Sequence, residues 1–193
     1  KDDRWGFRMA EPKLLYNQGE LYNLRVGYGT LTEEERFKIN QHIVQTEVML
    51  RQLPFPPHLT HVPEIAAGHH EKMDGTGYPK GLHHEQLRPE TRMLAIADIF
   101  EALTASDRPY KKPKKLSEAI EILNRMSQRG HIDPALFALF LSSGVYRVYA
   151  ERFLDPSQID DVPVTTYLAA TDGTRLAQRA DPAVARTLAS SSA

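Results

Sequence analysis

The chain of 193 residues contains no cysteine, so its sequence offers neither a disulfide nor a thiolate metal site. The strong metal ligands that remain are histidine, aspartate and glutamate, a set that suits iron, manganese or zinc. The chain also lacks any apolar run near the roughly 20 residues that a membrane helix needs. Its formal net charge is only -1, which gives no global basic field for duplex DNA or an anionic membrane surface. Any site for an anion must therefore be local.

The apolar residues recur with the spacing of helices. They make up 41% of the chain, which is enough for one buried core. Thr32 and Glu35 form a capping-box pattern that predicts the start of a long helix. His42 lies beside the apolar stripe of this helix, so we expect its imidazole to point inward, either as a hydrogen-bonded core histidine or as a ligand. The predicted fold class is all-α, with helices over residues 32–52, 62–71, 89–106, 117–128 and 134–153.

The most informative stretch runs from His69 to Pro79 and reads HHEKMDGTGYP. Adjacent residues on a helix project about 100° apart, so His69 and His70 would most easily serve two neighbouring metal ions. The glycines and the proline that follow them predict a loop of defined shape. The alternative is a histidine pair at a helix end that binds nothing, followed by an ordinary turn.

Two later segments carry charged residues that are candidates for binding a metal ion or a phosphate. Asp98 interrupts the apolar run 94–100, and a buried carboxylate is costly unless it is paired or bound to a metal, so we expect it to be a ligand. The alternative is that Asp98 faces solvent or pairs with Arg92. Arg108 and Lys111 lie in a cationic loop, where a guanidinium fork and an ammonium group suit phosphate oxygens.

The stretch from His69 to Pro79 resembles the HHExxDGxGYP signature of HD-GYP phosphodiesterases, and the resemblance extends over roughly residues 25–154. It continues through residues 32–35 with His42, 97–104 and 107–111. The resemblance implies a helical bundle of the HD superfamily type that holds two or three divalent metal ions, most often iron or manganese. It also implies hydrolysis of the bacterial messenger cyclic di-GMP to linear pGpG or GMP.

The resemblance assigns roles to individual residues. The implied metal ligands are His42, His69, His70 and Asp98, of which His69, His70 and Asp98 are also counted as catalytic. Glu71 and Asp74 are expected to orient the histidines through hydrogen bonds. The implied contacts with the substrate come from Gly77, Tyr78, Pro79, Arg108 and Lys111.

The chain contains no His-Asp dipeptide, the HD of the family name. We therefore expect a domain that is incomplete on its N-terminal side and is completed by residues upstream. One alternative is a non-catalytic module that binds cyclic di-GMP or another partner. Another is a phosphohydrolase of the wider HD superfamily acting on a different nucleotide, which the loop from Gly75 to Pro79 argues against.

The expected organisation has three parts: an irregular lead-in over residues 1–30, an HD-GYP-like helical domain over 31–155, and a loosely packed tail over 156–193. The absence of cysteine is consistent with a reducing compartment, and we expect a cytoplasmic location. The resemblance further implies an upstream sensor region, which could anchor the whole protein to a membrane, and a possible homodimer. No duplex nucleic acid is expected as a partner.

Overall fold

The structure, a computed structural model, describes residues 3–17, 19–24, 31–106 and 113–170. Within these ranges the regular elements are helices, and the only β pairing is one isolated bridge between Asp74 and His83. The prediction of an all-α fold is confirmed. The α-helices are α1 Glu20–Leu24, α2 Glu33–Leu50, α3 Val62–Ala67, α4 Pro89–Thr104, α5 Leu116–Gln128, α6 Pro134–Ser142, α7 Val145–Phe153 and α8 Val164–Ala170. Short 3-10 helices lie at Asp3–Trp5, Pro57–Leu59, His84–Gln86 and Pro156–Gln158.

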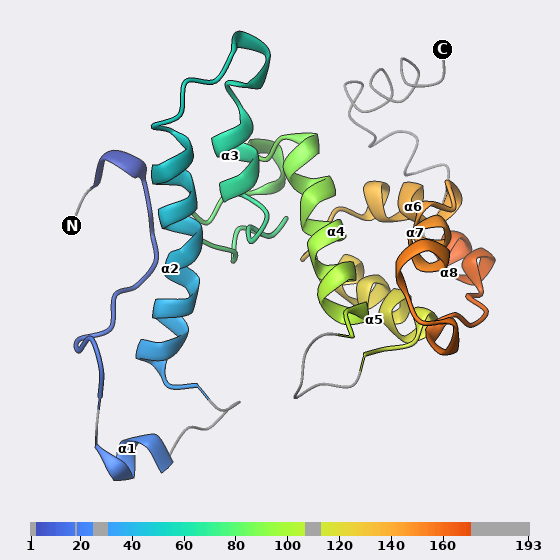
Figure 1. The fold of residues 1–193 in the computed structure, drawn as a ribbon, viewed down its shortest axis with the longest axis horizontal. Helices are drawn as coiled ribbons and strands as arrows, with labels where there is room; N and C mark the ends of the chain where they lie inside the picture. Colours follow the sequence, from blue (N-terminus) through green and yellow to red (C-terminus); the bar gives the residue numbers. More distant parts are fainter. Residues whose placement is uncertain (1–2, 18, 25–30, 107–112, 171–193) are drawn as a thin grey trace.

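The helices divide into two sides around α4 (Figure 1). On one side α2 packs against α3, and the segment that precedes α1 runs beside α2. On the other side α5 and α6 pack on α4, and α7 and α8 pack on α6. Among the described residues, no helix combines the length and the apolar character that crossing a membrane requires.

The long helix α2 begins where the sequence predicts. The Thr32 hydroxyl accepts a hydrogen bond from the Glu35 backbone N–H at 3.2 Å, and the Glu35 carboxylate accepts one from the Thr32 backbone N–H at 2.8 Å. Such a capping box satisfies two backbone donors that would otherwise lack partners. The helix ends at Leu50, before the prolines that start at Pro54, because proline has no N–H to continue it.

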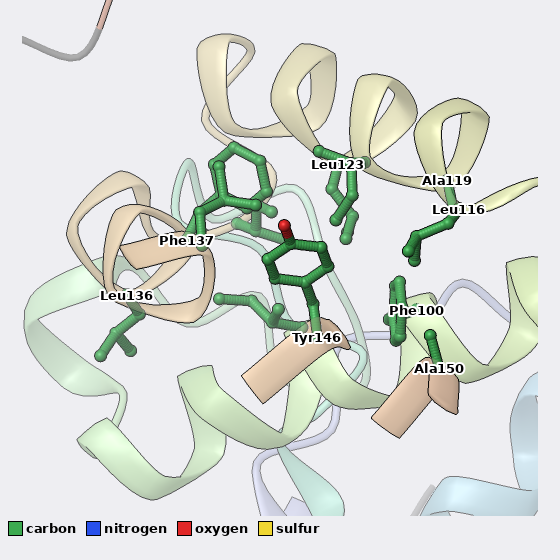
Figure 2. Packing of buried hydrophobic residues seen from close by; sticks show 12 residues of the cluster. Phe100, Leu116, Ala119, Leu123, Leu136, Phe137, Tyr146 and Ala150 are labelled. Carbon is green, nitrogen blue, oxygen red and sulfur yellow. The ribbon is translucent and has the colours of Figure 1, made fainter. Parts of the chain in front are cut away.

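The hydrophobic core lies between α4, α5, α6 and α7 (Figure 2). The side chains of Leu116, Ile120 and Leu123 on α5 are completely buried and face Phe100 of α4 in this cluster. Burial of this kind gives most of the free energy that holds such helices together, at about 1.5–3 kcal/mol for each large apolar side chain. The core therefore fixes α4, the helix that carries Asp98.

Two expectations for the C-terminal part need correction. The single helix predicted over residues 134–153 is wrong, because Gly144 adopts a left-handed φ of 72° and separates α6 from α7. The tail expected to be loosely packed is ordered over its first part. Gln158 is buried and donates to the carbonyls of Thr104 and Lys114, and α8 packs against the core. The rest of that tail, residues 171–193, lies outside the described residues.

A buried ion pair joins α4 to the start of α6. Arg92 donates from Nη1 to the Asp133 carboxylate at 2.5 Å, and both side chains are almost fully buried. The other oxygen of Asp133 accepts hydrogen bonds from the backbone N–H groups of Ala135 and Leu136, as an N-cap does. Asp133 is thus the ion-pair partner of Arg92, in place of the Asp98 pairing that the sequence left open.

Candidate metal centre

His42 meets the adjacent pair His69 and His70 in the structure, although it lies 28 residues before His70 in the sequence. One potential ligand atom from each of His42, His69 and His70 lies within 4.8 Å of the others. The Nε2 atoms of His42 and His70 are 3.3 Å apart, and the rings of His69 and His70 have centroids 4.2 Å apart. His42 comes from the middle of α2, and its imidazole is exposed rather than buried in the core as expected. It faces the other two histidines across the surface of the domain.

His69 and His70 lie in a turn and not on a helix. The helix predicted over residues 62–71 ends at Ala67, with Gly68 as its C-cap. The turn frees the two rings from the 100° separation that a helix would impose, so both can face His42. Gly68 is needed for a second reason, because a Cβ there would lie 2.5 Å from the Thr91 side chain of α4. This close approach was not predicted, although the glycine directly before the histidine pair could have indicated it.

Hydrogen bonds at Nδ1 prepare two of the imidazoles to bind a metal. Nδ1 of His42 lies 2.6 Å from the Ile39 carbonyl oxygen, and Nδ1 of His69 lies 2.6 Å from the Ala66 carbonyl oxygen. A carbonyl can only accept, so each Nδ1 carries the proton and the Nε2 lone pair is left available. A backbone carbonyl that fixes the tautomer in this way is typical of metal-binding histidines.

The surroundings of His70 favour its neutral imidazole. The pKa of His70 is lowered to about 4, first by burial and then by the neighbouring His69, while Asp98 raises it and His42 lowers it by less. His70 is therefore neutral at pH 7, which is the form that binds a metal ion. Three convergent histidines, of which His70 is neutral, fit a divalent metal ion.

Asp98 contributes a negative charge beside this cluster. Its charge raises the pKa values of both His70 and Tyr78, but its carboxylate is not among the ligand atoms that lie within 4.8 Å of one another. The expectation that Asp98 is buried was wrong, because its side chain is exposed on α4. Asp98 follows Thr91 by seven residues, or about two helical turns, so both project from the same face of α4. That is the face against which the turn at Gly68 packs.

Glu71 shapes the loop that follows the histidines. Its side chain is 1% exposed, and its carboxylate accepts hydrogen bonds from the backbone N–H groups of Lys80, Gly81 and Leu82 at 2.6, 3.1 and 2.9 Å. The expectation that Glu71 orients a histidine therefore needs correction, because its hydrogen bonds go to the loop backbone. Gly77 is required in the same loop, since a Cβ there would lie 2.4 Å from the Glu71 Cα.

Asp74 likewise holds the loop instead of a histidine. Its carboxylate accepts hydrogen bonds from the backbone N–H and the hydroxyl of Thr76 at 2.9 and 2.7 Å. These bonds lower the pKa of Asp74, because they favour its charged form. The second orienting residue expected from the sequence is thus a turn-forming residue.

Tyr78 lies against the histidine cluster. Its ring stacks on His70 with centroids 4.9 Å apart, and its backbone N–H donates to the His70 carbonyl at 3.2 Å. Burial and the charge of Asp98 raise the pKa of Tyr78, so its hydroxyl keeps its proton at neutral pH. Pro79 is buried beneath the loop. Arg108 and Lys111, the predicted phosphate contacts, lie outside the described residues.

The chain is similar in sequence to known proteins. The family model described as HD domain matches residues 1–136. The chain is 46% identical over 91 residues to the cyclic di-GMP phosphodiesterase PA4108 of Pseudomonas aeruginosa, which covers 46% of this chain and 21% of that protein. It is 38% identical over 111 residues to 3'3'-cGAMP-specific phosphodiesterase 3 of Vibrio cholerae, and this match covers 57% of this chain and 23% of that protein. A cyclic di-GMP phosphodiesterase of Thermotoga maritima is 41% identical over 101 residues, and this match covers 51% of this chain and 26% of that protein. The chain thus spans about a quarter of the length of these relatives, or less.

Proposed function

Because this chain belongs to the HD domain family, we propose that it carries part of the active site of a metal-dependent phosphodiesterase that hydrolyses cyclic di-GMP to pGpG or GMP. The observation that carries the proposal is the convergence of His42, His69 and His70 within 4.8 Å. The names of the relatives, which are phosphodiesterases of cyclic dinucleotides, support the class of substrate.

In this proposal His42, His69, His70 and Asp98 hold two or three divalent metal ions, iron or manganese by preference. When bound, such ions supply a water of lowered pKa and offset the negative charge of the phosphate. The protein's own part is to orient the imidazoles, which the bonds from His42 and His69 to backbone carbonyls support. Residues upstream of this chain complete the ligand set, since the chain has no His-Asp dipeptide.

The loop after the histidines is proposed to receive the dinucleotide. Tyr78 presents a protonated hydroxyl and an aromatic ring beside His70, so it can donate a hydrogen bond to a phosphate oxygen or stack on a base. Gly77 and Pro79 set the path of the backbone at this point. Arg108 and Lys111 are proposed to bind the two phosphates of the substrate.

Two alternatives each have an observation in their favour. The missing His-Asp dipeptide favours a module that binds cyclic di-GMP without hydrolysing it. The relative named as specific for 3'3'-cGAMP favours that dinucleotide as the substrate of the same site. A cytoplasmic location, an upstream sensor region and a homodimer belong to the proposal as well, in keeping with a second-messenger enzyme.

Chromatography of the products tests the proposal. The natural full-length protein and this chain by itself are each incubated with cyclic di-GMP or 3'3'-cGAMP in Mn²⁺ or Fe²⁺. Linear products from the full-length protein alone would support an enzyme whose site is completed outside this chain, and products from both would mean that this chain holds a sufficient site. Intact dinucleotides with both proteins, despite measurable binding, would contradict the proposal and favour a receptor.

A further inference from the structure

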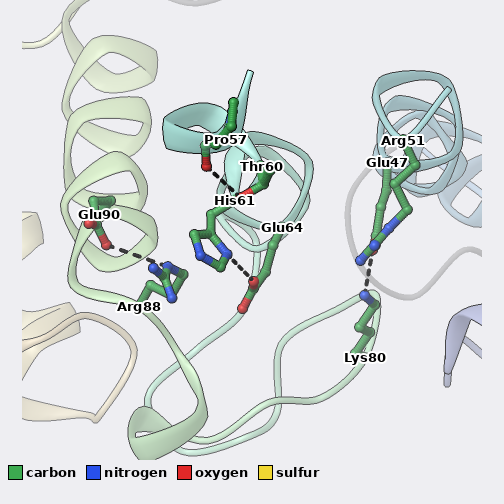
Figure 3. A network of polar contacts seen from close by, with 9 residues as sticks. All are labelled: Glu47, Arg51, Pro57, Thr60, His61, Glu64, Lys80, Arg88 and Glu90. Atoms are coloured by element: carbon green, nitrogen blue, oxygen red, sulfur yellow. Dashed lines mark hydrogen bonds and ion pairs between the residues drawn. The ribbon is translucent and has the colours of Figure 1, made fainter. Parts of the chain in front are cut away.

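Glu47 is a buried carboxylate outside the histidine cluster. It lies on α2 five residues after His42, and its side chain is completely buried. Its Oε1 atom accepts hydrogen bonds from Nε and Nη2 of Arg51 at 2.9 and 2.7 Å and from Nζ of Lys80 at 2.7 Å (Figure 3). Its Oε2 atom is buried without a hydrogen-bond partner among the described residues. Burying a charge is costly, so the carboxylate of Glu47 depends on the two cations with which it pairs.

Lys80 connects this carboxylate to the loop beside the histidines. It follows Tyr78 and Pro79 directly, and its backbone N–H donates to Glu71 at 2.6 Å. Its ammonium group crosses to Glu47 on α2, as Figure 3 shows. Lys80 is thus fixed at both ends by carboxylates, one within the loop and one on the helix that carries His42.

The N-terminal segment covers this network. The Phe7 ring lies 5.6 Å from Nζ of Lys80, and the Trp5 ring lies 5.6 Å from the guanidinium carbon of Arg51. The backbone N–H of Arg8 donates to the Pro79 carbonyl at 2.8 Å. Aromatic faces attract cations, so these two rings help to hold Lys80 and Arg51 in place. The segment therefore strengthens the Lys80–Glu47 ion pair, which is the tie between the loop and α2.

We propose that Glu47 is a positioning residue that acts through Lys80 to hold the loop around Tyr78 in place relative to His42. The tie matters because Tyr78 stacks on His70, and His70 in turn faces His42 at 3.3 Å. Loss of the tie lets the loop move relative to α2 and loosens the histidine cluster. The consequence for metal binding rests on the function proposed above, whereas the consequence for the loop does not.

Three variants test this role: Glu47→Gln, Lys80→Met and the double variant. Glu34→Gln is the matched control, because Glu34 is also a buried carboxylate on α2 but bonds the Tyr22 hydroxyl at 2.9 Å. Hydrogen exchange of the amides of Tyr78 and residues 80–82 is measured in the metal-free chain, and Mn²⁺ affinity is measured by electron paramagnetic resonance. We expect each single variant to speed loop exchange and to weaken Mn²⁺ binding by about 10-fold or more. The double variant should be no worse than either single one, and the control should match the wild type.

Unchanged loop exchange in Glu47→Gln would overturn the proposal, and so would losses that add up in the double variant. If Glu47→Gln fails to fold by circular dichroism, Lys80→Met decides alone, because it leaves the Glu47–Arg51 pair in place. If the wild-type chain binds no Mn²⁺, the histidines of this chain do not suffice to hold the metal by themselves, and loop exchange still decides the role of Glu47. Faster exchange would then support the positioning role, and unchanged exchange would overturn it.

Discussion

The side of the molecule formed by α5–α7 and the side formed by α2, α3 and the loop 68–82 bury different kinds of side chain. The first buries a large apolar cluster, centred on Leu116, Ile120, Leu123 and Phe137, with one ion pair, Arg92–Asp133, at its edge. The second buries the carboxylates of Glu34, Glu47 and Glu71. Apolar packing stabilises without strict direction, whereas hydrogen bonds to a carboxylate fix their partners in orientation. The comparison indicates that one side supplies stability and the other supplies the geometry of the site.

The largest expected effect is on the apolar side. Replacing Phe137, which is 1% exposed, by alanine leaves a cavity in the core and should lower the free energy of unfolding by about 3–5 kcal/mol. Urea denaturation measures the change. Phe153→Ala is the control, since that side chain is 61% exposed and should lose far less. Equal losses in the two variants would contradict the assignment of stability to this cluster.

Two glycine variants sharpen the comparison, because their costs in stability are similar and their effects on the site are not. Gly77→Ala brings a Cβ within 2.4 Å of the backbone of Glu71 and Lys72 and should cost about 1–3 kcal/mol. Gly144→Ala meets no neighbouring atom but must adopt a φ of 72°, at a cost of about 1–2 kcal/mol. We expect only Gly77→Ala to weaken Mn²⁺ binding, measured by titration calorimetry. Weakened binding in Gly144→Ala would show that any loss of stability loosens the site.

The smallest expected effect is on the titration of His70 in the metal-free chain. Its pKa of about 4 lies below the usual 6.5, so protonation favours the unfolded state. Stability should therefore fall as the pH decreases from about 6.5 towards 4, and no such loss is expected at higher pH. Nuclear magnetic resonance of the ring proton gives the midpoint. Asp98→Asn should move that midpoint lower, because the Asp98 charge raises the pKa of His70. A midpoint near 6.5 in the wild-type chain would contradict the half-buried, neutral imidazole of His70.

Local features of the fold and the site could be predicted from the sequence. The capping box at Thr32 and the start of α2 depend on residues three apart, and the structure has them as predicted. The HD-GYP resemblance over residues 69–79 is confirmed by the family match and by the named relatives. The gathering of His42 with His69 and His70 followed from that resemblance and not from periodicity.

Features that depend on tertiary contacts could not be predicted. The partners of Glu71 lie nine to eleven residues further along a folded loop, and the Lys80 partner of Glu47 lies 33 residues away. The exposure of Asp98 depends on which neighbours cover α4, and the apolar residues around it gave the opposite expectation. The break at Gly144 is a backbone conformation that glycine permits but does not require.

The central claim is that His42, His69 and His70 hold a divalent metal ion, and the Mn²⁺ content of histidine variants tests it most directly. The wild-type chain, His69→Ala and His58→Ala are dialysed against Mn²⁺, and bound metal per folded chain is measured by mass spectrometry. His58 is the control, because it lies exposed in the 3-10 helix Pro57–Leu59 and outside the cluster. We predict that Mn²⁺ is bound by the wild type and by His58→Ala and is lost in His69→Ala. Unchanged Mn²⁺ stoichiometry in His69→Ala would contradict the account.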